Sequence, residues 1–141
     1  MSSVQRRRET FRFPIRVYYE DTDAGGVVYY ANYLKYMERV RTEWLAALGY
    51  ELSTLERVEG IVFVVYRVEV DYRIPAKLGE KIDATLALVE LNRASMVVEQ
   101  DILRGGDVLT RARVALACVD RANWRLKRIP APLHERLERL P

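Results

Sequence analysis

The chain has 141 residues, 50% hydrophobic and 30% charged, which fits one globular domain spanning residues 1–141 with a core of its own. The single cysteine, Cys118, excludes an internal disulfide and favours a reducing compartment. A net charge of +3 is too mild to indicate nucleic acid by itself and suits a polyanionic small molecule equally well. The chain also has no basic stripe interleaved with aromatics, which argues against a nucleic-acid binder.

Two segment types are missing from the sequence. No stretch approaches the roughly 18 apolar residues that a membrane span needs. The start, MSSVQRRRET, has no apolar run after its arginines, so we expect no signal peptide. A cytoplasmic protein without a transmembrane segment is therefore expected.

The first half of the chain predicts one strand and one long helix. Residues 1–10 predict a polar, flexible lead-in. From Phe11 to Tyr19 apolar residues alternate with polar ones, which predicts a strand with one buried face. Apolar residues then recur at steps of three and four from Tyr33 to Leu48, as in a helix with one buried stripe. Asn32 is a candidate N-cap of this helix, and Gly49 a candidate C-terminal stop.

The second half predicts a short helix over residues 52–58 and four strands joined by turns. In the first strand, from residue 61 to 72, the even-numbered apolar residues are expected to share one face. The next strand covers residues 82–88 and turns at Asn92-Arg93, and another runs from residue 96 to Gly105-Gly106. The last strand covers residues 108–119, and the tail over 130–141 predicts a short helix. The fold class is α+β, an antiparallel sheet of about five strands wrapped around one long helix.

The segment from Tyr18 to Tyr33 carries the unusual chemistry. It holds Glu20, Asp21 and Asp23 within four residues, followed by Gly25-Gly26 and the predicted helix start. Glycines let backbone approach a ligand closely, and free N–H groups at a helix start suit an oxyanion. The structural alternative is a solvated acidic turn capped by one of the aspartates. A calcium loop of the EF-hand type, counted from Asp21, would need an oxygen ligand at its fifth position and an acid at its twelfth, but these are Gly25 and Asn32. A phosphoryl-transfer Asp-x-Asp motif usually follows a buried apolar strand, which is missing before Asp21.

Other catalytic groups are scarce. The only histidine, His134, lies in the tail, so a Ser-His-Asp triad, a histidine-based dehydratase and a histidine metal site are unsupported, and we expect no metal or cofactor. Cys118 lies in a predicted strand and is interpreted as a core thiol. Any hydrolysis must therefore rely on a carboxylate, with backbone amides as the electrophile.

The segment FRFPIRVYYEDTDAGGVVYYANYLKYMERVRTEWL, residues 11–45, resembles the hotdog-fold thioesterases of the 4-hydroxybenzoyl-CoA thioesterase superfamily. It is most similar to the YbgC subfamily, acyl-CoA thioesterases linked with the Tol-Pal cell-envelope system. Residues 63–82 match more loosely, and the similarity extends to about residue 130. The resemblance implies hydrolysis of an acyl-CoA, with acyl carrier protein as another thiol donor. It also implies a homodimer joined edge to edge, often paired into a homotetramer, with active sites between subunits. Peripheral attachment to the inner membrane stays open.

The resemblance also assigns roles to residues. Asp23 matches the catalytic aspartate, as nucleophile or general base, and Tyr30 matches the residue whose backbone N–H polarises the thioester carbonyl. YbgC-type sequences commonly carry histidine at the position of Tyr30, so any auxiliary role of that side chain is absent or altered here. The remaining expected substrate contacts are Gly26, Asn32 (or a helix cap), Tyr33 (or core), Phe63, Val64 and Val65 from the partner subunit, and Arg93 toward the CoA phosphates (or a solvated arginine). A non-catalytic hotdog module that binds acyl-CoA or an envelope partner is the alternative.

Overall fold

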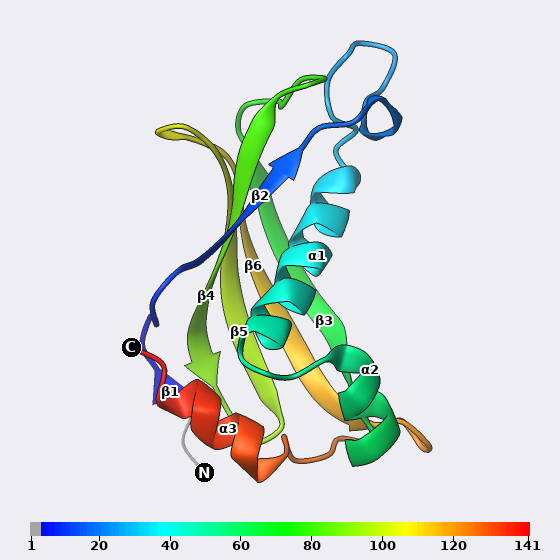
Figure 1. The fold of residues 1–141 in the computed structure, drawn as a ribbon, viewed down its shortest axis with the longest axis vertical. Helices are drawn as coiled ribbons and strands as arrows, with labels where there is room; N and C mark the ends of the chain where they lie inside the picture. The colour runs from blue at the N-terminus through cyan, green and yellow to red at the C-terminus, as the bar shows by residue number, and fades with distance from the viewer. Residues whose placement is uncertain (1–3) are drawn as a thin grey trace.

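The computed structural model describes residues 4–141 and shows one curved antiparallel sheet with a long helix against one face (Figure 1). The strand order is β1-β4-β5-β6-β3, and β2 also pairs with β4. This confirms the α+β architecture, including the first long strand joining the sheet after the helix. The strands are β1 (Val4–Gln5), β2 (Phe11–Arg16), β3 (Ile61–Tyr72), β4 (Lys81–Leu91), β5 (Ser95–Arg104) and β6 (Asp107–Asp120). The helices are α1 (Asn32–Ala47), α2 (Leu52–Thr54), continued by a π-helical turn over Leu55–Glu59, and α3 (Ala131–Glu138).

Helix α1 buries one stripe against the sheet, as its period predicts. The buried residues recur at steps of three and four: Tyr33, Tyr36, Met37, Val40, Trp44 and Leu45. Gly49 follows the helix at φ +94°, and its N–H donates to the carbonyl of Ala46, which confirms the predicted stop. The predicted N-cap is wrong. Ala31 occupies that position without a side-chain cap, and Asn32 is the first helical residue.

The alternation predicted for β3 is only half right, because the strand carries a β-bulge. The register against β6 shifts between Val65 and Arg67, so Tyr66 is an extra residue. Phe63 pairs with Cys118 and Val65 with Leu116, both inward-facing on β6, whereas after the bulge it is Val68, Val70 and Tyr72 that pair with inward-facing residues. The inserted residue therefore reverses the two faces of the strand, and Val62, Val64 and Tyr66 do not share the face of Val68.

Two predictions at the N-terminal end differ from the structure. The first long strand ends at Arg16 rather than Tyr19, which is 82% exposed in a 3₁₀ turn over Tyr19–Asp21. The lead-in over residues 1–10 was predicted to be flexible, but its described part makes defined contacts. Val4–Gln5 pairs with β4, and Arg8 is buried with its N–H donating to the carbonyl of Leu88. This short strand adds a sixth strand to the expected five or so.

The remaining elements follow the sequence. Strands β4, β5 and β6 pair in order, and Gly105 turns between β5 and β6 at φ +60°. Leu133 and Leu137 of α3 are buried, as is the thiol of Cys118, whose pKa burial raises to about 11. None of the helices in the described range is long and apolar enough to cross a membrane.

Candidate active site

The acidic segment folds into a tight turn that begins at Asp23. Thr22 pairs with Val28, and the N–H of Asp23 donates to the carbonyl of Val27 at 2.9 Å. The N–H of Gly26 closes the turn on the carbonyl of Asp23 at 3.1 Å, with Gly26 at φ +78°. A side chain at position 26 would be strained in this left-handed conformation. The described contacts of Gly26 are therefore those of a turn.

Asp21 holds this turn against the helix start. Its buried carboxylate accepts the N–H of Tyr18 through Oδ2 at 2.9 Å. Its carbonyl oxygen accepts both the N–H of Tyr29 and the side-chain amide of Asn32, each at 2.9 Å. Asn32 is therefore a strut between α1 and the acidic turn rather than a helix cap, and its contact with substrate stays a prediction. These bonds place Asp21 beside residues 29–32 at the start of α1, with Asp23 two residues further along the same turn.

The Asp23 side chain is exposed in the isolated chain. Its Oδ1 accepts the N–H of Gly25 at 2.8 Å, the kind of local turn that the structural alternative describes. Its Oδ2 has no hydrogen-bond partner among residues 4–141. A Cβ at position 25 would lie 3.2 Å from Oδ1, so Gly25 lets the backbone approach the carboxylate. The sequence notes both glycines but predicts a substrate contact only at Gly26.

The helix start leaves two backbone donors free. The N–H groups of residues 32, 33 and 34 donate to the carbonyls of residues 29, 30 and 31 at 2.8, 3.3 and 3.2 Å. The N–H groups of Tyr30 and Ala31 find no acceptor within the described part of the chain. Unpaired N–H groups at the positive end of a helix dipole attract an oxygen that gains negative charge. Tyr30 therefore presents the type of donor that the resemblance assigns to it.

Aromatic rings surround this helix start. The Tyr30 ring lies 4.9 Å from that of Tyr29 and 5.9 Å from that of Tyr72, which in turn lies 5.6 Å from Tyr33. Tyr33 is buried, and its hydroxyl accepts the N–H of Ala76 at 2.9 Å. Burial raises the pKa of the Tyr33 hydroxyl. Tyr30, Tyr33 and Tyr72 also line a hollow of about 150 Å³, so Tyr33 is both a core residue and a wall of this hollow.

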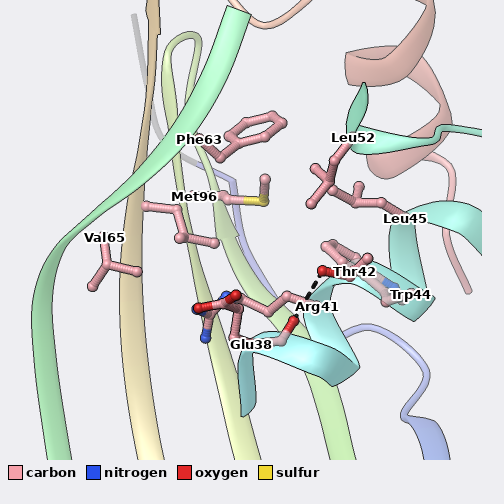
Figure 2. Close-up of a pocket in the computed structure, with 10 residues that line it drawn as sticks. Glu38, Arg41, Thr42, Trp44, Leu45, Leu52, Phe63, Val65 and Met96 are labelled. Atoms are coloured by element: carbon pink, nitrogen blue, oxygen red, sulfur yellow. Dashed lines mark hydrogen bonds between the residues drawn. The ribbon is translucent and has the colours of Figure 1, made fainter. Parts of the chain in front are cut away.

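A larger cleft of about 390 Å³ opens further along α1, between that helix and the sheet (Figure 2). Phe63 and Val65 line it from β3, in the same chain as the helix. Their contact with an acyl group bound to the partner subunit stays a prediction. Val64 points to the other face and does not line it. The other lining residues are Glu38, Arg41, Thr42, Trp44, Leu45, Leu52, Met96 and Leu116. Glu38 and Arg41 were not singled out from the sequence, because charged residues flanking a buried stripe look like any solvated helix face.

Arg93 lies far from this region within one chain. It is exposed in the turn between β4 and β5, and its carbonyl accepts the N–H of Ile129. That turn and the Asp23 loop lie at opposite ends of the sheet (Figure 1). The structure therefore places Asp23 in the same hydrogen-bonded segment as Tyr30 and Tyr33, and leaves Phe63, Val65 and Arg93 apart from that segment. No cluster of three or more metal-ligating side chains occurs in residues 4–141.

Comparison with known proteins places the chain in a family. The model of the thioesterase-like superfamily matches residues 17–137. The chain is 44% identical over 110 residues to the acyl-CoA thioesterase YbgC of Haemophilus influenzae, covering 78% of this chain and 81% of that protein. It is 38% identical over 121 residues to the acyl-CoA thioester hydrolase YbgC of Escherichia coli O157:H7, covering 85% and 90%. A probable thioesterase from Bartonella henselae superposes with a TM-score of 0.83 at 34% identity, covering 86% of this chain and 100% of that chain. The chain thus belongs to the thioesterase-like superfamily, as a hotdog-fold member similar to the YbgC acyl-CoA thioesterases.

Proposed function

We propose that this protein hydrolyses an acyl-CoA thioester to the free acid and CoA, with Asp23 and the backbone N–H of Tyr30 as its catalytic groups. The observation that carries the proposal is the free N–H of Tyr30 at the helix start, in the same hydrogen-bonded segment as Asp23, whose carboxylate has one unpaired oxygen. The YbgC relatives, which are named for this activity, support it.

The reaction needs stabilisation of an oxyanion and activation of a nucleophile. The N–H of Tyr30, aided by the helix dipole, stabilises the negative charge that develops on the thioester oxygen, and loss of one such donor typically costs about 10²–10³ in rate. Asp23 either attacks the carbonyl carbon, giving an acyl anhydride that water then opens, or removes a proton from the attacking water. In both routes the CoA thiolate leaves and takes up a proton, and water supplies the second oxygen of the acid.

The topology supports a site that two subunits share. β3 ends the strand order and offers a free edge, so a second copy can extend the sheet by antiparallel pairing. Tyr72 at one end of β3 touches Tyr30, whereas Phe63 and the cleft lie toward the other end. Antiparallel pairing of two β3 strands sets Phe63 of the partner subunit near the Tyr72 end of this chain. The cleft of each subunit would then face the Asp23 loop of the other.

The same two-fold arrangement offers a role for Arg93. Its turn is tied to residue 129, next to exposed Lys127 and Arg128, with Arg125 close in sequence. These four cations suit the phosphates of CoA. Because this turn and the Asp23 loop lie at opposite ends of one sheet, Arg93 would serve the active site built on the partner's loop.

A thiol-release assay on the purified protein with a panel of acyl-CoAs tests the activity. We expect Asp23→Asn to lower kcat at least about 10²-fold with little change in KM. Glu20→Gln is the matched control, because Glu20 is an exposed carboxylate of the same segment with no hydrogen bond of its own in the described structure. Its kcat should stay within about twofold of the original protein.

The outcomes separate the alternatives. Equal loss in both variants, or full turnover by Asp23→Asn, refutes the role of Asp23. Tight binding of acyl-CoA without turnover indicates the non-catalytic module instead. Rapid quenching followed by mass spectrometry distinguishes the two chemical routes, since only the nucleophilic route makes the chain heavier by one acyl group.

A further inference from the structure

The cleft between α1 and the sheet combines apolar walls with one charged corner. Trp44, Leu45, Met96 and Leu116 are buried and form its deeper wall, with Phe63 and Leu52 beside them. Glu38, Arg41 and Thr42 come from one flank of α1, at steps of three and four. Figure 2 shows Glu38 and Arg41 together on one side of the cleft and the side chains of Phe63 and Met96 on the other.

Arg41 lacks the partner that a half-buried guanidinium usually has. One of its nitrogens, Nη1, donates to the neutral amide oxygen of Gln100 at 3.0 Å, and that amide in turn donates to the carbonyl of Met37 at 2.9 Å. No carboxylate lies within ion-pair distance of Arg41 in residues 4–141. Unlike those of Arg8, its remaining N–H groups are not sealed in the core, so they stay open to a ligand.

Glu38 supplies the complementary group. Its carboxylate lines the same cleft and is exposed, but it forms no ion pair with Arg41. A cation and an anion on one wall, close yet unpaired, match a ligand group that both accepts and donates a hydrogen bond. A hydroxyl does both. A second carboxylate would gain from Arg41 but would be repelled by Glu38.

We propose that this cleft receives the acyl group of the substrate and that Arg41, with Glu38, selects acyl groups that carry a hydroxyl several carbons from the thioester. The proposal rests on the proposed thioesterase function and adds a substrate class to it. A plain hydrocarbon chain would strip water from the guanidinium and return no acceptor, which is unfavourable. The hydroxyl of a hydroxylated chain accepts a hydrogen bond from Arg41 and donates one to Glu38. The carbons of that chain pack against Trp44 and Phe63.

The test compares three thioesters of equal length: hexanoyl-CoA, 6-hydroxyhexanoyl-CoA and adipoyl-CoA. We expect kcat/KM for the hydroxylated substrate to exceed that for hexanoyl-CoA by about tenfold, as for one hydrogen bond to a charged group. Arg41→Met, close in length and uncharged, should abolish this ratio by lowering kcat/KM for 6-hydroxyhexanoyl-CoA much more than for hexanoyl-CoA. Glu38→Gln should raise kcat/KM for adipoyl-CoA. Lys35→Met is the matched control, because Lys35 is an exposed cation of the same helix that does not line the cleft.

Some results would overturn the proposal. The selective role of Arg41 is refuted if Arg41→Met keeps the original ratio of kcat/KM between 6-hydroxyhexanoyl-CoA and hexanoyl-CoA. It is also refuted if the variant loses kcat/KM equally on all three substrates. If no thioester is cleaved at all, the proposed function fails and the cleft is tested by binding. In a Trp124→Phe background Trp44 is the only tryptophan, so its fluorescence can follow binding of the non-hydrolysable thioethers hexyl-CoA and 6-hydroxyhexyl-CoA. Tighter binding of the hydroxylated thioether supports the proposal. Equal affinity for the two thioethers refutes it.

Discussion

Substitution of Asn32 distinguishes the strut seen in the structure from the helix cap that the sequence predicts. An N-cap uses its side-chain oxygen as an acceptor, so aspartate would replace asparagine at little cost. In the structure Asn32 instead donates from Nδ2 to the carbonyl of Asp21 at 2.9 Å. Aspartate cannot donate, and its carboxylate would face that carbonyl oxygen. The two readings therefore predict opposite outcomes for Asn32→Asp.

The magnitude follows from the bonds that remain. Asn32→Ala removes one partly buried hydrogen bond, while the carbonyl of Asp21 keeps the N–H of Tyr29, so the free energy of unfolding should fall by about 1 kcal/mol. For a chain of this size that corresponds to about 3–4 °C in Tm. Asn32→Asp should lose at least as much, because the repulsion between oxygens offsets the gain of about 0.3–1 kcal/mol from an acid at the helix start.

Urea unfolding followed by tryptophan fluorescence, at a fixed protein concentration, measures both variants. Because the strut ties the Asp23 turn to α1, thiol release should weaken in both variants as well. A stability of Asn32→Asp equal to that of the original protein, beside a clear loss in Asn32→Ala, would refute the strut and restore the cap.

Four further predictions follow from the geometry. Gly25→Ala should lower kcat about tenfold with little change in stability, because the new Cβ pushes against Oδ1 of Asp23; a thiol-release assay checks it. Tyr33→Phe should cost about 1–3 kcal/mol of unfolding free energy in urea, since the buried N–H of Ala76 loses its acceptor. Val68→Lys on the free edge strand should yield monomers in analytical ultracentrifugation, and an unchanged oligomer would argue against the β3 interface. Burial raises the pKa of Cys118 from 9.0 to about 11, so the unfolded chain ionises this thiol at a lower pH than the folded protein does. The free energy of unfolding should therefore fall by about 2–3 kcal/mol as the pH rises from 9 to 11. Cys118→Ala should remove this part of the pH dependence, measured as the difference in unfolding free energy between the two proteins.

Elements with a strong hydrophobic period were readable from the sequence. The stripe of α1 and the strands β4 to β6 fall where alternation or helical spacing predicts them, because burial of one face decides both pattern and structure. The bulge at Tyr66 was not readable, since an extra residue leaves a run of alternating apolar residues looking regular. The lead-in was misjudged because its three arginines look solvated, yet Arg8 is buried.

The site was only partly predictable for a different reason. A resemblance carried by a contiguous motif identifies Asp23 and Tyr30, which lie in one segment. The roles of Asp21 and Asn32 depend on hydrogen bonds that cross from the turn to the helix, and no local pattern encodes them. The cleft lined by Glu38, Arg41 and Phe63 combines residues from α1 and β3, so it exists only once the helix lies against the sheet.

The extra residue in β3 also bears on how this cleft can change in evolution. Deleting Tyr66 would join Val65, which pairs with Leu116, directly to Arg67, which pairs with Ala115. Both halves of the strand would then keep their partners on β6 and their faces, so Phe63 and Val65 would stay in the cleft. The loss of this one residue would remove the bulge and reduce the local twist of the strand. Relatives without the extra residue should therefore keep the same wall of the cleft on a straighter β3.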